Sequence, residues 1–139
     1  MRGRILAIDP GGRRVGLALS DPLRMIASPY RTLLINDTTD ALDQLEAVIA
    51  EEDVREIVVG LPQRPGQEES QQAKAVRTFI AALRSRFPLP IHEIDESFTS
   101  VEAEEVLHQM GRRIGQDKGA VDRIAASLIL KQYLHENQI

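Results

Sequence analysis

The sequence predicts an α/β fold in which a mixed five-stranded sheet carries helices on both faces, with the element order βββαβαβαα. Two patterns predict this class. Three apolar runs separated by short turns come first, which favours an antiparallel meander. Two more apolar runs then alternate with amphipathic helical patterns, and such crossovers make strands parallel to their neighbours. A chain of 139 residues fits one domain, residues 1–139, that buries about two thirds of its unfolded surface.

The three leading strands are expected over residues 4–9, 14–20 and 25–34. The first two are continuous apolar runs on either side of a glycine-rich turn, which is typical of strands buried on both faces. Pro29 interrupts the third run, and proline cannot donate a hydrogen bond within a sheet. The third strand is therefore predicted to lie at an edge or to contain a bulge.

The middle of the chain predicts a helix over residues 37–52, a strand over 57–61 and a polar loop over 63–72. Apolar residues recur at three- and four-residue spacing in the helix and give it one apolar face. The strand is a short apolar run that ends at Pro62. A Pro-Gly pair breaks the polar stretch that follows, so a loop is predicted there.

The C-terminal half predicts three helices and one more strand. The helices are expected over residues 73–87, 99–111 and about 120–136, and the strand over 91–96. Between the last two helices, the segment 112–119 is basic and contains glycine. No internal repeat or domain linker is visible in the sequence.

Composition narrows the class of protein. The chain has 17 Lys and Arg against 21 Asp and Glu, and a net charge of −4 argues mildly against a nucleic-acid binder. The basic residues gather near both ends, however, so the net charge does not decide the question. There are no cysteines, which excludes disulfides and thiolate metal sites. No apolar run approaches ~18 residues, so we expect a cytoplasmic protein with no membrane partner.

Three carboxylates stand out by their placement. Asp9 ends the first strand, Glu96 ends the fifth, and Asp122 lies in the first turn of the last helix. Asp9 and Glu96 can meet if the first and fifth strands run parallel with the fourth close by, because sites collect outside the carboxyl ends of strands. Asp95 is a further candidate on spacing, but alternation sends it to the opposite face.

Converging carboxylates repel one another unless a cation lies between them. Oxygen ligands without His or Cys suit Mg²⁺ or Mn²⁺, the ions of phosphoryl transfer. Each carboxylate taken singly also has an ordinary explanation: a turn residue, a solvated strand end or a charge at a helix N-terminus. Their conjunction favours the metal site. The turn after Asp9 adds backbone N–H groups and the guanidinium groups of Arg13 and Arg14, which suit a phosphate.

Four motifs in this order and spacing resemble the YqgF family of RNase H-like nucleases, which is linked to pre-16S rRNA processing and to Holliday junction resolution. The resemblance covers nearly the whole chain and rests on residues 8–21, 58–62, 95–100 and 118–126. It implies an RNase H-like fold and endonucleolytic hydrolysis of a structured nucleic acid. It favours maturation of the 5′ end of small-subunit rRNA, with precursor particles of the ribosome as partners.

The resemblance implies that Asp9, Glu96 and Asp122 are the metal-binding catalytic carboxylates. Lys118 and Arg123 would then extend the phosphate-binding surface that Arg13 and Arg14 begin.

The chain departs from the family pattern beside one of these carboxylates. Ser97 follows Asp95 and Glu96 where the family usually has Arg, and a serine offers only one neutral hydrogen bond to phosphate. Arg13, Arg14 or Arg64 would have to supply the missing charge.

Other functions follow from the same residues. A branched-DNA resolvase would use the same carboxylates, and a ribosome-assembly factor could keep the fold with weak or no catalysis. A nucleotide-binding ATPase of the sugar-kinase type also has Asp-x-Gly after its first strand, but it pairs two such domains, and a second copy is absent from the sequence. The sequence leaves RNA against DNA open, and a monomer and a homodimer are equally compatible with it.

Overall fold

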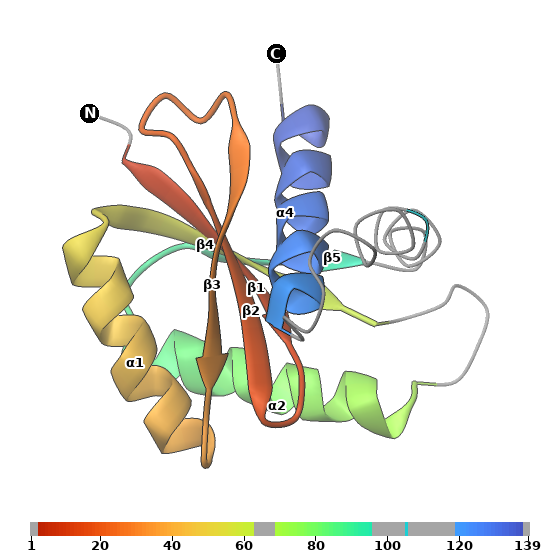
Figure 1. The fold of residues 1–139 in the computed structure, drawn as a ribbon. Coiled ribbons are helices and arrows are strands. Elements are labelled where there is room, and N and C mark those ends of the chain that lie inside the picture. Colours follow the sequence, from red (N-terminus) through yellow and green to blue (C-terminus); the bar gives the residue numbers. More distant parts are fainter. Residues whose placement is uncertain (1–2, 63–68, 96–104, 106–118, 138–139) are drawn as a thin grey trace.

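The computed structural model describes residues 3–62, 69–95, 105 and 119–137 (Figure 1). Its elements are β1 (Arg4–Pro10), β2 (Arg14–Ser20), β3 (Ala27–Leu34), α1 (Thr38–Glu51), β4 (Val54–Leu61), α2 (Gln71–Arg86), β5 (Ile91–Asp95) and α4 (Gly119–Glu136). The helix expected over 99–111 and the basic segment 112–118 lie outside the described residues, apart from position 105. None of the helices in the described ranges is long and apolar enough to cross a bilayer.

The five strands form one sheet in the order β3-β2-β1-β4-β5. β1, β2 and β3 pair antiparallel, whereas β4 pairs parallel to β1 and β5 pairs parallel to β4. The predicted meander and the predicted parallel crossovers are therefore both confirmed.

The strand that contains Pro29 is an edge strand with a bulge. β3 pairs with β2 alone, and its register shifts where Leu17 faces Arg31 and Ala18 faces Pro29. Tyr30 is the extra residue on the bulged strand. Both expectations drawn from the proline are confirmed.

Several boundaries differ from the predicted ones for local reasons. β3 begins at Ala27 because the Asp21 carboxylate accepts hydrogen bonds from the backbone of the preceding residues, including Met25 at 2.7 Å, and holds them in a loop. α2 begins two residues early because the Ser70 hydroxyl caps it. β4 begins at Val54 rather than at residue 57. Its first three residues include two polar side chains, so they fall outside the apolar run that predicts the strand.

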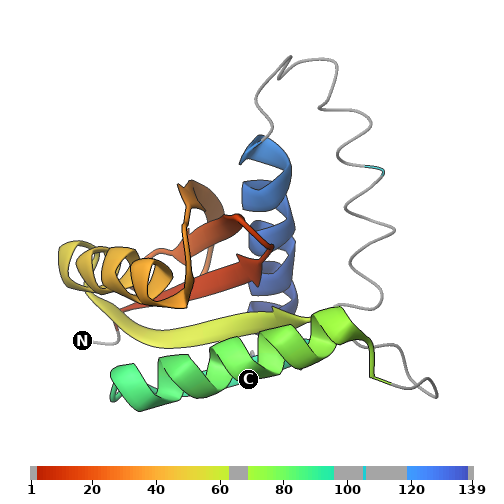
Figure 2. The same cartoon turned by 90° about the horizontal axis from the view of Figure 1, so that it is seen from below.

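The helices cover both faces of the sheet, as predicted (Figure 2). α1 and α2 pack on one face over the larger apolar cluster, which includes Leu6, Ile8 and Ile57. α4 packs on the other face over a smaller cluster, which includes Ile5 and Ala7. Adjacent residues of β1 therefore belong to different cores.

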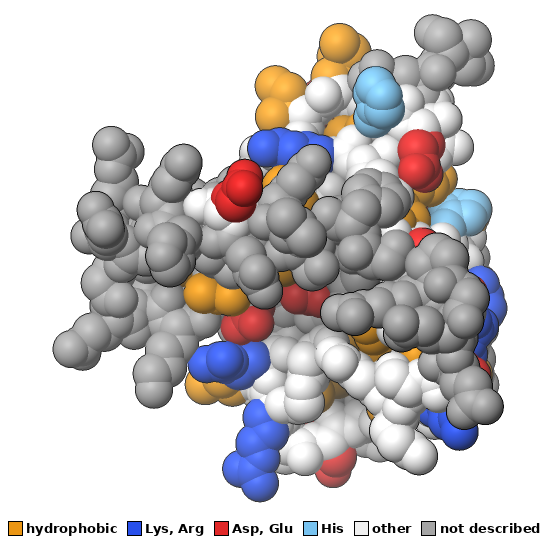
Figure 3. Space-filling model, turned by 90° about the vertical axis from the view of Figure 1, so that its right-hand side faces the viewer, with side chains coloured by type: hydrophobic (Ala, Val, Ile, Leu, Met, Phe, Trp, Pro, Cys, Tyr) orange, Lys and Arg blue, Asp and Glu red, His pale blue; other side chains and the backbone are white. Residues whose placement is uncertain are grey.

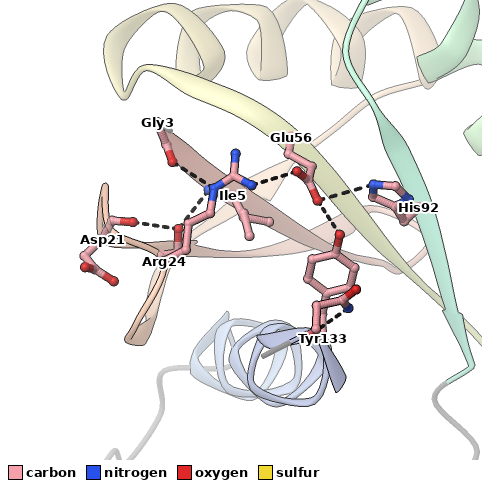
Figure 4. Close-up of polar contacts among 9 residues, drawn as sticks. Gly3, Ile5, Asp21, Arg24, Glu56, His92 and Tyr133 are labelled. Atoms are coloured by element: carbon pink, nitrogen blue, oxygen red, sulfur yellow. Dashed lines mark hydrogen bonds and ion pairs between the residues drawn. The ribbon is translucent and has the colours of Figure 1, made fainter. Parts of the chain in front are cut away.

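A polar network fixes the far end of α4 to the sheet (Figure 4). The Glu56 carboxylate of β4 accepts a hydrogen bond from Arg24 at 2.8 Å and another from the Tyr133 hydroxyl of α4. Nε2 of His92 lies 3.3 Å from the same carboxylate, and the His92 ring stacks on Tyr133. Arg24 also donates to the backbone carbonyl of Gly3 at 3.1 Å. These contacts join the β2–β3 loop, β4, β5 and α4.

We expect Tyr133→Phe to be less stable than the parent at neutral pH, by about 1–3 kcal/mol, because the largely buried Glu56 carboxylate loses a hydrogen-bond donor. Burial, and then the hydrogen bond to Glu56, raises the pKa of Tyr133 to about 12. Between pH 10 and about 12 the unfolded chain releases this proton and the folded chain keeps it, so the parent loses stability as pH rises. The Phe variant lacks this loss, and the difference in urea midpoint should shrink above pH 10. A constant difference across this pH range would contradict the assignment.

Candidate active site at the carboxyl edge of the sheet

Three parallel strands end at one edge of the sheet. β1, β4 and β5 run in the same direction with β4 in the middle, and their last residues are Pro10, Leu61 and Asp95. For Asp9 and Glu96 to meet, the first and fifth strands must run parallel with the fourth close by, and β1, β4 and β5 fulfil this condition. Ligands of α/β sheets bind outside this edge.

Asp9 lies on the face of the sheet that α4 covers. Side chains alternate between faces along a strand. Ile5 and Ala7 belong to the cluster under α4, whereas Leu6 and Ile8 belong to the cluster under α1 and α2. Continuing this alternation along β1 places Asp9, which is half-buried, on the α4 face.

Gly16 brings Asp122 to the same place. In the β1–β2 ladder, Gly16 is the direct partner of Asp9. A Cβ atom on Gly16 would lie 2.0 Å from the carbonyl oxygen of Asp122 and 2.9 Å from its Cβ atom, so the first turn of α4 rests on the bare backbone of this glycine. Gly16 therefore pairs with Asp9 within the sheet and contacts Asp122 on the α4 face, which brings the two aspartates close to each other.

Asp122 is held in a partly buried, cationic setting. Its side chain is 18% exposed, and Nε of Arg14 lies 3.3 Å from Oδ2. Burial raises the pKa of Asp122, and the nearby charges of Arg14 and Arg123 partly offset that rise. Oδ2 is buried and accepts no hydrogen bond from any part of the chain that the structure describes. The Arg14 guanidinium is therefore its partner through an ion pair and not through a hydrogen bond.

The basic residues of the prediction fall into different positions. Arg13 and Arg14 are exposed on the β1–β2 turn, which the N–H of Gly11 closes by donating to the carbonyl of Arg14 at 3.0 Å. Arg123 is half-buried and donates to the hydroxyl of Thr32 on β3 at 3.2 Å. It thus ties the start of α4 to the sheet while its charge stays near Asp122.

Glu96, Ser97, Lys118 and Arg64 lie outside the described residues. Asp95 is described and exposed at the end of β5. Glu93, two residues earlier on the same face of β5, forms an ion pair with Arg77 of α2. Alternation therefore places Asp95 on the α2 face, away from Asp9 and Asp122, as the sequence predicts.

The donor set at this edge fits a hard divalent cation. Within the described ranges, no three His, Asp or Glu side chains gather closely enough to hold a metal, and the third predicted ligand, Glu96, is not among those residues. Asp9 and Asp122 nevertheless supply carboxylate oxygens from two elements, one of them buried without a hydrogen bond. Such ligands suit Mg²⁺ or Mn²⁺. Figure 3 shows acidic side chains set back near the centre of the face it displays, with basic side chains beside them.

Solved structures of Holliday junction resolvases share this fold. RuvC of T. thermophilus in complex with a Holliday junction substrate matches with a TM-score of 0.55 and 15% identity, over 97% of this chain and 96% of that one. The fowlpox virus resolvase in its complex with Holliday junction DNA matches with a TM-score of 0.59 and 12% identity, over 96% and 97%. The chain therefore has the RNase H-like fold of these proteins.

The chain belongs to the RuvX family, described as Holliday junction resolvase, whose profile matches residues 3–136. Two similar relatives carry the name "Putative pre-16S rRNA nuclease". The one from Koribacter versatilis is 45% identical over all of this chain and 91% of that protein. The one from Lachnospira eligens is 40% identical over 97% and 99%. The resemblance inferred from the four motifs is thus confirmed, and the chain is by family a phosphodiester-hydrolysing enzyme.

Sequence reasoning gave Gly16 no role of its own. The structure makes it the contact that sets Asp122 beside Asp9. The available signal was a glycine inside an otherwise apolar strand, which often marks a close approach of another backbone.

Proposed function

We propose that this protein is a divalent-metal-dependent endonuclease that cleaves structured nucleic acid, with precursor 16S rRNA as its substrate. The observation that supports it most directly is that Gly16 pairs with Asp9 in the sheet and is also in contact with Asp122 of α4. Carboxylates that lie close together are stabilised when a cation lies between them. Such a cation would make the edge a phosphate-binding site.

Asp9, Asp122 and Glu96 are the residues that would hold the ion. The chemistry supplied by such an ion is Lewis-acid stabilisation of charge on the phosphate oxygens and on the nucleophilic water. The chain contributes a fixed geometry: α4 cannot slide over the sheet without losing the close contact of Asp122 with Gly16. It also contributes partial burial, which strengthens charge interactions at Asp122.

The turn after Asp9 would bind the phosphate backbone. Arg13 and Arg14 are exposed there, next to the carboxylates, and guanidinium groups bind phosphate through two parallel hydrogen bonds. Lys118 and Arg123 extend the same surface in this proposal. Arg14 has a second task, because its charge lies beside Asp122 and balances it.

The names of the relatives favour RNA, and the family description favours branched DNA. We propose pre-rRNA as the first candidate because the two relatives named above, at 45% and 40% identity, carry that name. In this proposal the enzyme acts in the cytoplasm on ribosomal precursor particles. A four-way DNA junction is the second candidate, since a carboxylate–metal site hydrolyses either backbone.

The test is cleavage by the purified protein of a precursor 16S rRNA fragment and of a four-way DNA junction, each with Mg²⁺, with Mn²⁺ and with chelator. Metal-dependent cleavage of the RNA at discrete positions supports the proposal. Cleavage of the junction alone would move the substrate to branched DNA. Binding of either without cleavage in any metal would replace the enzyme by a non-catalytic assembly factor.

Arg14→Gln is expected to weaken binding of the substrate and to lower the slope of log affinity against log salt by about 1, because one phosphate contact is lost. Binding is measured by fluorescence anisotropy in an Asp9→Asn background, so that cleavage does not interfere. Arg55→Gln is the matched control. It removes the same charge from an exposed arginine that pairs with Asp53 at the start of β4, the end of the strand opposite the candidate site. Equal salt slopes for the two variants would exclude Arg14 from the phosphate surface.

A further inference from the structure

A cavity lies behind the β1–β2 turn, on the face of the sheet that α1 and α2 cover. Its volume is about 270 Å³. Its walls come from the turn, the start of α1 and one side of α2, and include Gly11, Gly12, Thr38, Gln72, Ala75 and Phe79. The cavity has no part in the proposed nuclease reaction, since neither Asp9 nor Asp122 lines it.

The cavity and the acidic edge share one turn. Asp9 lies on the α4 face of β1, and the next residue, Pro10, ends the strand and borders the cavity on the opposite face, followed by Gly11 of the turn. A Cβ atom added to Gly12 would meet nothing within 4 Å, so the outer side of the turn is open to close approach. A nucleic-acid strand with a phosphate at Asp9 can therefore reach over the turn with the attached nucleotide.

The lining selects the chemistry of the occupant. None of the described residues that form the walls is ionisable, which disfavours a phosphate or another charged group. The half-buried ring of Phe79 and the methyl group of Ala75 supply apolar surface, and Thr38 and Gln72 supply a hydroxyl and an amide. Pockets for drug-sized ligands begin at about 300 Å³, so this one suits a smaller, flat, neutral heterocycle.

We propose that the cavity receives one unstacked nucleobase of the substrate strand, next to the phosphate that lies at Asp9 and Asp122. A base offers an apolar face for Phe79 and polar edges for Thr38 and Gln72. This inference rests on the proposed nuclease function and adds a requirement to it: the nucleotide beside the cleaved bond must be unpaired. The protein would thereby choose loops, junctions and single strands over continuous duplex.

Ala75→Phe tests the cavity by filling it. Ala75 is exposed on α2, so a larger side chain there does not enter the core. We expect kcat/KM on the cleaved substrate to fall about tenfold, the loss that accompanies removal of one stacked base. Ala81→Phe is the matched control, because it places the same ring on an exposed position of α2 that does not line the cavity. Thermal melting checks that both variants fold, and Ala75→Leu provides a smaller filler.

Abasic substrates identify the base. Removing one base at a time around the cleaved bond should lower kcat/KM of the parent about tenfold at one position, and Ala75→Phe should then cleave that abasic substrate as fast as Ala81→Phe does. A flat abasic scan would overturn the proposal, and so would equal rates for the two Phe variants on the intact substrate.

A binding readout separates this inference from the nuclease function. Neutral nucleosides titrated into methyl-labelled protein should shift the signals of Val76 and Ile35, which line the cavity, in the parent and in Ala81→Phe but not in Ala75→Phe. Absence of shifts in the parent would overturn the base pocket even if the protein cleaves RNA. Shifts in a protein that cleaves nothing would keep the pocket and reject the nuclease.

Discussion

Replacing Asp9 by Asn should abolish cleavage while the protein stays folded. Even residues that only support metal ligands contribute about 10- to 100-fold to activity, so loss of a ligand charge should cost more than about 100-fold. The substitution removes charge and almost no volume. Because the substitution also removes one of two neighbouring negative charges, the melting temperature without metal should be unchanged or higher.

The same variant should lose its thermal response to metal. An ion that binds only the folded state raises the melting temperature of the parent in proportion to the logarithm of its concentration. Asp9→Asn should show little of this rise in Mg²⁺ or Mn²⁺. The control is Asp43→Asn, which removes a carboxylate that is 60% exposed and pairs with Arg86 on the other face of the sheet. Cleavage by Asp9→Asn at the parental rate would show that the site lies elsewhere.

Most of the fold was accessible from the sequence because its signals are local. Continuous apolar runs marked β1 and β2, three- and four-residue spacing marked the helices, and Pro29 marked an edge strand with a bulge. The errors fell where a side chain from elsewhere completes an element. β4 starts earlier than its apolar run because Glu56, a poor strand residue on its own, finds partners in Arg24 and Tyr133.

The candidate site was only partly accessible. Asp9 and Asp122 could be selected from the sequence because each is a carboxylate at the end of a buried strand or the start of a helix. The order of strands and helices then predicted that they lie at the same edge of the sheet. The sequence does not reveal that α4 lies directly on Gly16 or that the half-exposed Arg14 pairs with Asp122. Both features depend on a contact between segments about a hundred residues apart in the sequence. The glycine inside the apolar strand indicates a close approach of another backbone, but no local pattern identifies α4 as the segment that makes it. The cavity behind the turn is likewise a product of how α1 and α2 pack.

Gly16→Ala should be strongly destabilising and should also remove activity. Within a strand, alanine is favoured over glycine by about 0.5–1 kcal/mol, and Gly16 has no left-handed backbone that would need glycine. Any loss must therefore come from the contact with α4. The added Cβ atom would lie 2.0 Å from a backbone oxygen of Asp122, which cannot rotate away, so α4 must lift from the sheet.

We expect Gly16→Ala to lower the free energy of unfolding by about 3 kcal/mol, at the upper end of overpacking effects. The activity of the protein that remains folded should fall at least about a hundredfold, because a shift of about 1 Å in a catalytic group has such an effect. Gly12→Ala is the matched control for stability: the same methyl group, four residues earlier, meets nothing within 4 Å. Urea unfolding is measured on both variants, and cleavage by Gly16→Ala is compared with that of the parent. If the two variants are equally stable and Gly16→Ala cleaves at the parental rate, α4 does not rest on Gly16, and the juxtaposition of Asp122 with Asp9 is lost as the basis of the site.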